Sequence, residues 1–294
     1  MPLSVLPLCV PLPLALAAAY VLLRRGVRAR TAARVMQGAT LLALALALIS
    51  GGLLAAAPQW SGMSASLNSV TATMAALVAF VGWIDVRYAA TYLDGAERQA
   101  GFLGWIGATL AAVLLLAQTA NLIVFVGAWI ATSLFLHRLL VFYGDRVQAV
   151  RAGRKKFIVA RAGDAALIAA AALLFFGYDA LHIETILADA RSGVAPSGVV
   201  WAAALLALAA VLKSAQFPTH GWLTEVMETP TPVSALLHAG VINAGGFLLI
   251  RFADVMLLAP GVLAVLVMIG GFTALLGGLA MFAIAITLAF QWIG

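Results

Sequence analysis

Long apolar stretches alternate with short polar connectors along nearly the whole chain. The pattern predicts spanning segments near 3–23, 36–57, 67–90, 101–117, 119–142, 157–178, 197–217, 231–257 and 261–292. Most are close to the ~20 residues that an α-helix needs to cross the hydrocarbon core of a bilayer. Backbone N–H and C=O groups find no water in that core, so each segment must satisfy them internally as a helix. We therefore expect an all-α, polytopic transmembrane bundle of about eight or nine spans.

Composition supports the membrane interpretation and excludes several classes of protein. The 294 residues are 64% hydrophobic and 10% charged, with a mean hydropathy of +1.09. Soluble domains have about 45–50% apolar and about 25% charged residues, so a soluble domain is excluded. The single cysteine, Cys9, excludes an internal disulfide and a cysteine-based metal site. No motif for phosphate or metal binding is present, so we expect no cofactor in this chain.

The basic residues indicate orientation rather than nucleic-acid binding, although the formal net charge is +6. Fourteen of the seventeen Lys and Arg residues fall in connectors on one side of the predicted membrane. Only Arg191 and Arg251 fall on the other side, and Lys213 belongs to neither. The positive-inside rule then places the N-terminus outside. The first apolar run has no basic residues before it, which favours an uncleaved span over a secretory signal.

Lys213 is the first candidate for an ion site inside the membrane. It closes an apolar run and lies five residues before Pro218, which removes a backbone donor and interrupts the helix. A broken helix exposes carbonyl groups and a helix end within the membrane, where ions can be coordinated. A lysine near a helix end that extends its charge to the interface explains the same pattern about equally well.

The next apolar segment carries a second set of polar residues. His238 lies inside it after a proline-containing start, and Ser234 and Asn243 extend a polar stripe that could hold water. Histidine passes protons near neutral pH because its ordinary pKa is near 6.5. A single buried histidine is nevertheless more often a hydrogen-bonded packing residue.

Two acidic residues have a structural interpretation on sequence grounds. Asp164 starts the predicted span 157–178, where it would interact with the helix dipole or with Arg161. Asp85 ends the third span, where a local interfacial pair with Arg87 is expected.

The predicted connectors supply the remaining candidates. His220, Glu225 and Glu228 lie on the connector after the break, where they could bind a partner or form a proton entrance. Ordinary loop polarity explains them equally well. The segment 179–197 is expected to be a short amphipathic element on the outer surface.

Two motifs resemble the proton-translocating antiporter-like membrane subunits of respiratory NADH dehydrogenase and multisubunit sodium/proton antiporters. They are KSAQFP at 213–218 and PTPVSALLHAG at 230–240. The similarity extends over most of residues 70–281. By this resemblance, Lys213 matches the family's broken-helix lysine, His238 its following-helix histidine, and Asp164 the acid at the start of its sixth helix.

The sequences EVMETP at 225–230 and NAGGF at 243–247 look most like one branch, the DabB-type subunits of bacterial inorganic-carbon uptake systems. That resemblance implies conduction of protons or sodium ions in the bacterial inner membrane, to energise a large cytoplasmic DabA-like partner. The partner would resemble a carbonic anhydrase and hold the zinc. The chain itself would catalyse no covalent chemistry.

The chain departs from the family pattern in two ways. By the resemblance, Trp129 or a neighbour within 125–130 stands where the family's fifth helix has a glutamate that pairs with the lysine, and no acid is within reach in the sequence. The family also continues into a second, inverted half, so we expect either a truncation or a partner that supplies the other half-channel. We divide the chain into N-terminal helices (1–66), an antiporter-like core (67–260) and a C-terminal helix (261–294).

Two alternatives remain open from the sequence. The first is a pumping subunit of a respiratory NADH dehydrogenase or of a cation/proton antiporter complex. The second is a membrane scaffold that conducts no ions, which the missing acid and the missing second half both favour.

Overall fold

The computed structural model describes residues 6–24, 26–56, 68–143, 146–224 and 229–293. The side chains of residues 6, 224, 238, 239 and 284–293 are outside the description. Glu225 and Glu228, two of the connector candidates, therefore lie outside the described residues.

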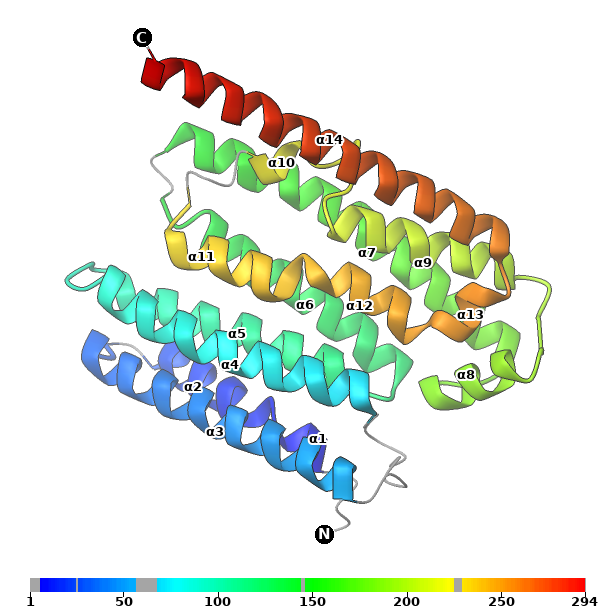
Figure 1. Cartoon of the computed structure of the whole chain (residues 1–294). Coiled ribbons are helices and arrows are strands. Elements are labelled where there is room, and N and C mark those ends of the chain that lie inside the picture. Colours follow the sequence, from blue (N-terminus) through cyan, green and yellow to red (C-terminus); the bar gives the residue numbers. More distant parts are fainter. Residues whose placement is uncertain (1–5, 25, 57–67, 144–145, 225–228, 294) are drawn as a thin grey trace.

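The described residues form a helical bundle without β-strands, which confirms the predicted all-α membrane class (Figure 1). The helices are α1 (Leu6–Cys9), α2 (Leu12–Leu23), α3 (Ala29–Ala56), α4 (Ser69–Tyr92), α5 (Gln99–Gln118), α6 (Leu122–Leu140), α7 (Val147–Tyr178), α8 (Ile183–Arg191), α9 (Val199–Lys213), α10 (Gly221–Thr224), α11 (Thr231–Leu236), the π-helical turn η3 (Leu237–Val241), α12 (Asn243–Arg251), α13 (Ala253–Leu257) and α14 (Pro260–Ile293). By length and composition, six described helices can cross a membrane: α3 to α7 and α14.

The helices lie in successive layers across the bundle (Figure 1). α2 and α3 form one edge, α4 and α5 come next, and α6 lies in the middle with the broken helix α11–η3–α12. α7 and α9 pack against each other on the far side. Large side chains such as Trp129 and Phe252 fill the core, and many small residues let the backbones approach closely.

Two predicted segment boundaries are wrong. Span 157–178 belongs to a helix that begins at Val147, so the basic flank before it is helical too. Segment 231–257 is not one helix, because η3 and a further break after Arg251 divide it. At η3 the N–H of Ile242 donates to the carbonyl of Leu237, five residues earlier, which is π-helical bonding.

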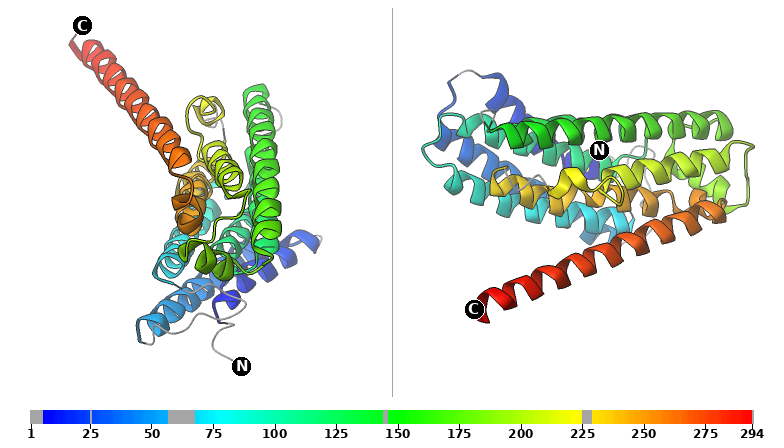
Figure 2. Two further views of the ribbon diagram at one scale, coloured as in Figure 1. Left: turned by 90° about the vertical axis from the view of Figure 1, so that its right-hand side faces the viewer. Right: turned by 90° about the horizontal axis from the view of Figure 1, so that it is seen from above.

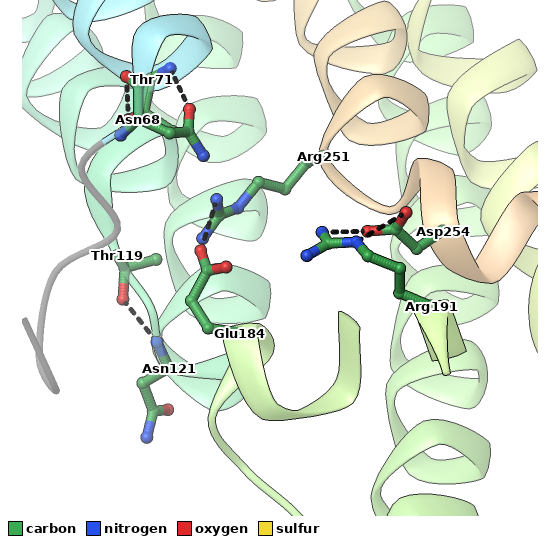
Figure 3. A network of polar contacts seen from close by, with 8 residues as sticks. All are labelled: Asn68, Thr71, Thr119, Asn121, Glu184, Arg191, Arg251 and Asp254. Carbon is green, nitrogen blue, oxygen red and sulfur yellow. Dashed lines mark hydrogen bonds and ion pairs between the residues drawn. The ribbon is translucent and has the colours of Figure 1, made fainter. Parts of the chain in front are cut away.

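The amphipathic element predicted within 179–197 is confirmed as α8, whose apolar residues Ile183, Ile186 and Leu187 are buried. Figure 3 shows two ion pairs that join α8 to the following helices. The buried Arg251 of α12 binds Glu184 at 3.0 Å. The exposed Arg191 binds Asp254 of α13 at 2.7 Å.

The last helix, α14, projects away from the rest of the bundle (Figure 2). It packs against α13 and α9, and it touches the connector that follows Lys213. There the N–H of Phe217 donates to the hydroxyl oxygen of Thr273 at 3.1 Å, and the rings of Phe217 and Phe272 meet edge to face. Most apolar side chains of its described part, such as Met268, are exposed.

Candidate functional site

Lys213 ends α9 inside the bundle and is only 8% exposed. Its ammonium group donates to three oxygen atoms of α6. These are the hydroxyls of Ser133 at 2.8 Å and Thr132 at 2.9 Å, and the carbonyl of Trp129 at 3.3 Å. A buried lysine whose donors are all directed at protein oxygens is not one that extends to the membrane surface. This geometry does not match the interfacial interpretation of Lys213, and a role in ion translocation stays a prediction.

The break after Lys213 follows from the local sequence. Ala215 adopts a left-handed backbone conformation, with φ of 50°, which ends regular helical hydrogen bonding. Pro218, three residues later, has no N–H to donate. The predicted break at 213–218 is confirmed, since no helix is assigned again before Gly221.

Helix α6 is positioned by Asn121, which precedes its first turn. The Asn121 side-chain oxygen accepts hydrogen bonds from the N–H groups of Ile123 and Val124, at 2.9 and 3.1 Å. This is a standard N-cap, which satisfies donors that would otherwise be unpaired. The cap fixes the start of the helix whose third and fourth turns carry the oxygen atoms that bind Lys213.

Trp129 lies in the stretch of α6 where the family resemblance implies a glutamate. The Lys213 nitrogen lies 4.4 Å from the centre of the Trp129 ring, which is cation–π geometry. The α6 side of the site thus offers a π face and neutral oxygens in place of a carboxylate.

Lys156 is a second buried lysine that the sequence analysis missed. It is 4% exposed, and its ammonium group donates to the carbonyl of Ser133 at 2.9 Å. Ser133 therefore contacts both lysines, Lys213 through its hydroxyl and Lys156 through its carbonyl. A helical pattern could have indicated this burial, because Ala149 and Gly153 lie on the same α7 face at spacings of seven and three residues.

Asp164 supplies the acidic group of the site from α7. It is 4% exposed and forms an ion pair with Arg161, as one of the two sequence interpretations expected. The helix-dipole interpretation is wrong, because α7 begins at Val147 and Asp164 lies in the middle of the helix. Asp164 also interacts electrostatically with Lys213 and Lys156, although no contact ion pair joins it to either lysine in the described part of the chain.

The predicted polar stripe on the next segment is not a buried one. Ser234 is half-buried and Asn243 is exposed, and neither donates to or accepts from Lys213. His238 lies in η3, and its side chain is outside the described residues. The link between the two helices is made instead by Ser214, whose hydroxyl donates to the carbonyl of Ile242 at 2.8 Å.

Two further candidates lie apart from the lysines. His220 is exposed and stacks on the ring of Phe217 at 5.7 Å. The expected pair between Asp85 and Arg87 does not form. The Arg87 guanidinium instead lies over the Trp83 ring, 5.4 Å from its centre. Asp85 is instead buried within the bundle.

The described residues contain no group of three or more His, Cys, Asp or Glu side chains placed to hold a metal ion. The arrangement is instead a chain of ionisable groups from two helices, with a third helix between the two lysines. Lys213 comes from α9, Lys156 and Asp164 come from α7, and α6 lies between the two lysines as a neutral scaffold. Lysine can release its proton, unlike arginine, so such a chain can hold and pass protons.

Residues 119–286 match the family model described as NADH:quinone oxidoreductase/Mrp antiporter, membrane part. The match covers more than half of the chain, and the chain belongs to this family. The matched region contains Lys213, Lys156 and Asp164.

Individual relatives cover two branches of the family. A probable inorganic carbon transporter subunit DabB from Hydrogenovibrio crunogenus is 42% identical over 225 residues, 76% of this chain and 43% of the relative. NADH-quinone oxidoreductase subunit L from Escherichia coli is 32% identical over 235 residues, 76% of this chain and 38% of the relative. The chain therefore spans less than half the length of these relatives.

A solved structure gives the same fold. The Mrp complex from Dietzia sp. DQ12-45-1b contains a chain that superposes with a TM-score of 0.75 at 26% identity. The match covers 92% of this chain and 30% of that one. The membrane-helix architecture described above is thus similar to that of part of one chain of this Mrp complex.

Proposed function

We propose that this chain conducts protons, or sodium ions, through the membrane, and that Lys213 is the group that takes up and releases the proton. The observation behind the proposal is a buried lysine at a helix break, held by three oxygens of α6 and without a contact carboxylate among the described residues. In the charged form its three donors match those three oxygens. In the neutral form the amine has one lone pair, and the Ser133 hydroxyl can rotate and donate to it.

Lys156 and Asp164 would couple Lys213 to its surroundings. Two ammonium groups that approach the same residue, Ser133, repel each other when both are charged, so a proton moving at one changes the other. The carboxylate of Asp164 acts on both lysines from α7. Asp164 would thus provide the negative charge that the family pattern places on α6.

We further propose that the ion flow energises uptake of inorganic carbon by a partner. The identity of 42% to a probable inorganic carbon transporter subunit supports this over the other branches. The partner would be the large cytoplasmic zinc-binding DabA-like subunit, and zinc would be bound there. The chain would lie in the bacterial inner membrane with its N-terminus outside, and His220 would be available to the partner on the inner side.

Growth of a bacterium without its own carbonic anhydrases tests this function. The strain would express this chain with the DabA-like partner at ambient CO2, as wild type or as Lys213→Ala at equal membrane abundance. Rescue by the wild type and failure of the variant are expected. Equal rescue by both would contradict a role of Lys213 in conduction, and failure of both would contradict the inorganic-carbon function.

A second candidate is a pumping subunit of a cation/proton antiporter or respiratory complex, which the Mrp likeness and the identity to subunit L both favour. Co-purification separates the two functions. A large soluble zinc protein is expected for carbon uptake, and several small membrane subunits for the antiporter.

The third candidate is a scaffold that conducts no ions, and Trp129 in place of the family's acid is the observation in its favour. It predicts that Lys213→Ala leaves uptake unchanged while the partner still binds. The buried Asp164 weakens this candidate, because a carboxylate near both lysines is present after all.

A further inference from the structure

Asp85 is a buried acid that the Lys213 site does not use. It lies on α4 and is 3% exposed, and neither of its carboxylate oxygens has a hydrogen-bond partner among the described residues. Arg87 is engaged with the Trp83 ring, so the nearest basic residue in the sequence does not neutralise it. An ionised carboxylate left unpaired in an apolar interior is strongly unfavourable, whereas a carboxyl group that holds a proton is far less so.

A small cavity adjoins the Asp85 side chain. Its volume is about 10 Å³, near the lower limit for one water molecule. Its walls come from α4, α5, α11 and η3, and include Leu110, Val113, Leu236 and Gly240. Asp85 is the only polar side chain in this lining. A single proton carrier therefore faces a space that fits one water or none.

The wall of this cavity is formed in part by the irregular turn of the broken helix. Gly240 belongs to η3, and Leu236 immediately precedes that turn. π-helical turns inside α-helices often mark functional sites, because the extra residue locally changes the backbone hydrogen bonding. The turn also lies at the centre of the bundle, where α4 and α5 pack on it.

The broken helix separates Asp85 from Lys213. α11 and η3 pack against α4, whereas α12 packs against α9, and Figure 1 shows the broken helix between those layers. On the far side, the Ser214 hydroxyl binds the carbonyl of Ile242, directly after η3. A shift of η3 would therefore reach both the residue after Lys213 and the cavity of Asp85.

We propose that the Asp85 carboxyl is a second proton-binding site, on the α4–α5 side of the broken helix. A proton moves from a water molecule onto a carboxylate oxygen of Asp85, and it leaves as the same O–H bond breaks toward water. The turn η3 forms the movable wall that admits that water. The use of this site in conduction rests on the function proposed above, but its bound proton does not.

Few charged groups surround Asp85. α5 and α11 contribute no charged or histidine side chain, and η3 contributes only His238, whose side chain is outside the described residues. α3 contributes Arg30 and Arg34, both exposed near its start. Asp85 therefore exchanges its proton with water and not with a neighbouring cation.

Infrared difference spectroscopy of the membrane complex, reconstituted with its co-purifying subunits, tests the bound proton. We expect a protonated-carboxyl C=O band that shifts in heavy water and is absent from Asp85→Asn. The exposed acid Asp179 gives the matched control, because Asp179→Asn keeps the band. Identical spectra for wild type and Asp85→Asn would overturn the proposal. If Asp85→Asn does not assemble, Asp85→Glu decides, because it must move the band without removing it.

The same complex, reconstituted into liposomes, allows proton flux to be measured. This measurement tests whether Asp85 takes part in conduction. Asp85→Asn is expected to lower flux several-fold relative to Asp179→Asn. If the infrared band is assigned to Asp85 but Asp85→Asn leaves proton flux unchanged, the role of Asp85 in conduction is overturned. If Lys213→Ala leaves flux unchanged, the proposed function fails, and the infrared band still decides whether Asp85 holds a proton.

Discussion

Two regions of this molecule hold buried basic side chains in opposite ways. Lys213 is held by neutral oxygens and an aromatic face, with its acid, Asp164, at longer range. At the α8 end of the bundle, Arg251 binds Glu184 directly at 3.0 Å (Figure 3). Both cations are nearly inaccessible, so burial alone does not distinguish them.

The difference lies in whether the charge can change. An arginine stays protonated, and a carboxylate in direct contact matches its fixed charge. A lysine among hydroxyls and carbonyls can lose its proton without leaving a carboxylate unpaired beside it. The arginine–carboxylate pair suits a structural role, and the lysine among neutral oxygens suits a proton carrier.

The largest effect should come from removing the acid that acts on the lysines from a distance. Asp164→Asn keeps the shape of the side chain but removes its negative charge, and its amide oxygen can still accept a hydrogen bond from Arg161. We expect proton flux in liposomes to fall at least about tenfold, or about 1.4 kcal/mol on the barrier. Flux equal to that of Asp179→Asn would contradict a role for Asp164.

A smaller loss of flux is expected when the second buried lysine is neutralised. Lys156→Met removes the charge that shares Ser133 with Lys213, but it leaves Lys213 and its ligands in place. Lys155→Met is the matched control, because Lys155 is the adjacent, exposed lysine. If both variants conducted equally, Lys156 would be a packing residue and not part of the chain of ionisable groups.

Helices α9 and α12, which carry Lys213 and Arg251, pack against each other, and two glycines of α12 allow this packing to be tested. A Cβ at Gly245 would lie 2.5 Å from the carbonyl oxygen of Ala210 on α9, whereas a Cβ at Gly246 would meet nothing within 4 Å. Gly245→Ala should therefore destabilise the protein by about 1–3 kcal/mol. Thermal unfolding in detergent should give a lower Tm for Gly245→Ala than for Gly246→Ala, and equal values would contradict the close approach.

Breaking the buried ion pair between Arg251 and Glu184 should lower the stability of the protein but change proton flux little. Glu184→Gln leaves the buried Arg251 guanidinium without its carboxylate, which should cost about 1–3 kcal/mol. Asp254→Asn removes the charge that pairs with the exposed Arg191 and should lower the Tm less, because solvent screens that pair. The two values of Tm provide the check. A larger loss for Asp254→Asn would reverse the assignment of the buried pair as the stronger one.

The membrane class, the break after Lys213 and the surface helix α8 were all predictable from the sequence. Each depends on a local signal: apolar runs of spanning length, a proline after a lysine, and an amphipathic spacing. The π turn η3 was not predictable, because segment 231–257 reads as one continuous apolar run and a π turn has no comparable local signal.

The contents of the site were only partly predictable, because they depend on which helices pack together. Lys213 and Asp164 could be named in advance, but Lys156 lies in a basic run that resembles an interfacial flank. Its burial follows from the extension of α7 and its packing on α6, and the sequence indicates it only through the helical spacing from Ala149 and Gly153. Asp85 was misassigned for the same reason, since packing of α4 against α5 and η3 places it inside the bundle.

In the proposed function, Lys213 supports proton conduction because its ammonium group can release a proton. Proton flux through liposomes that contain the complex should be compared for wild type, Lys213→Arg and Arg251→Lys, at equal abundance. We expect Lys213→Arg to lose flux although the positive charge is kept, and Arg251→Lys to retain it. Wild-type flux through Lys213→Arg would contradict the account, because a fixed charge would then be sufficient at this position.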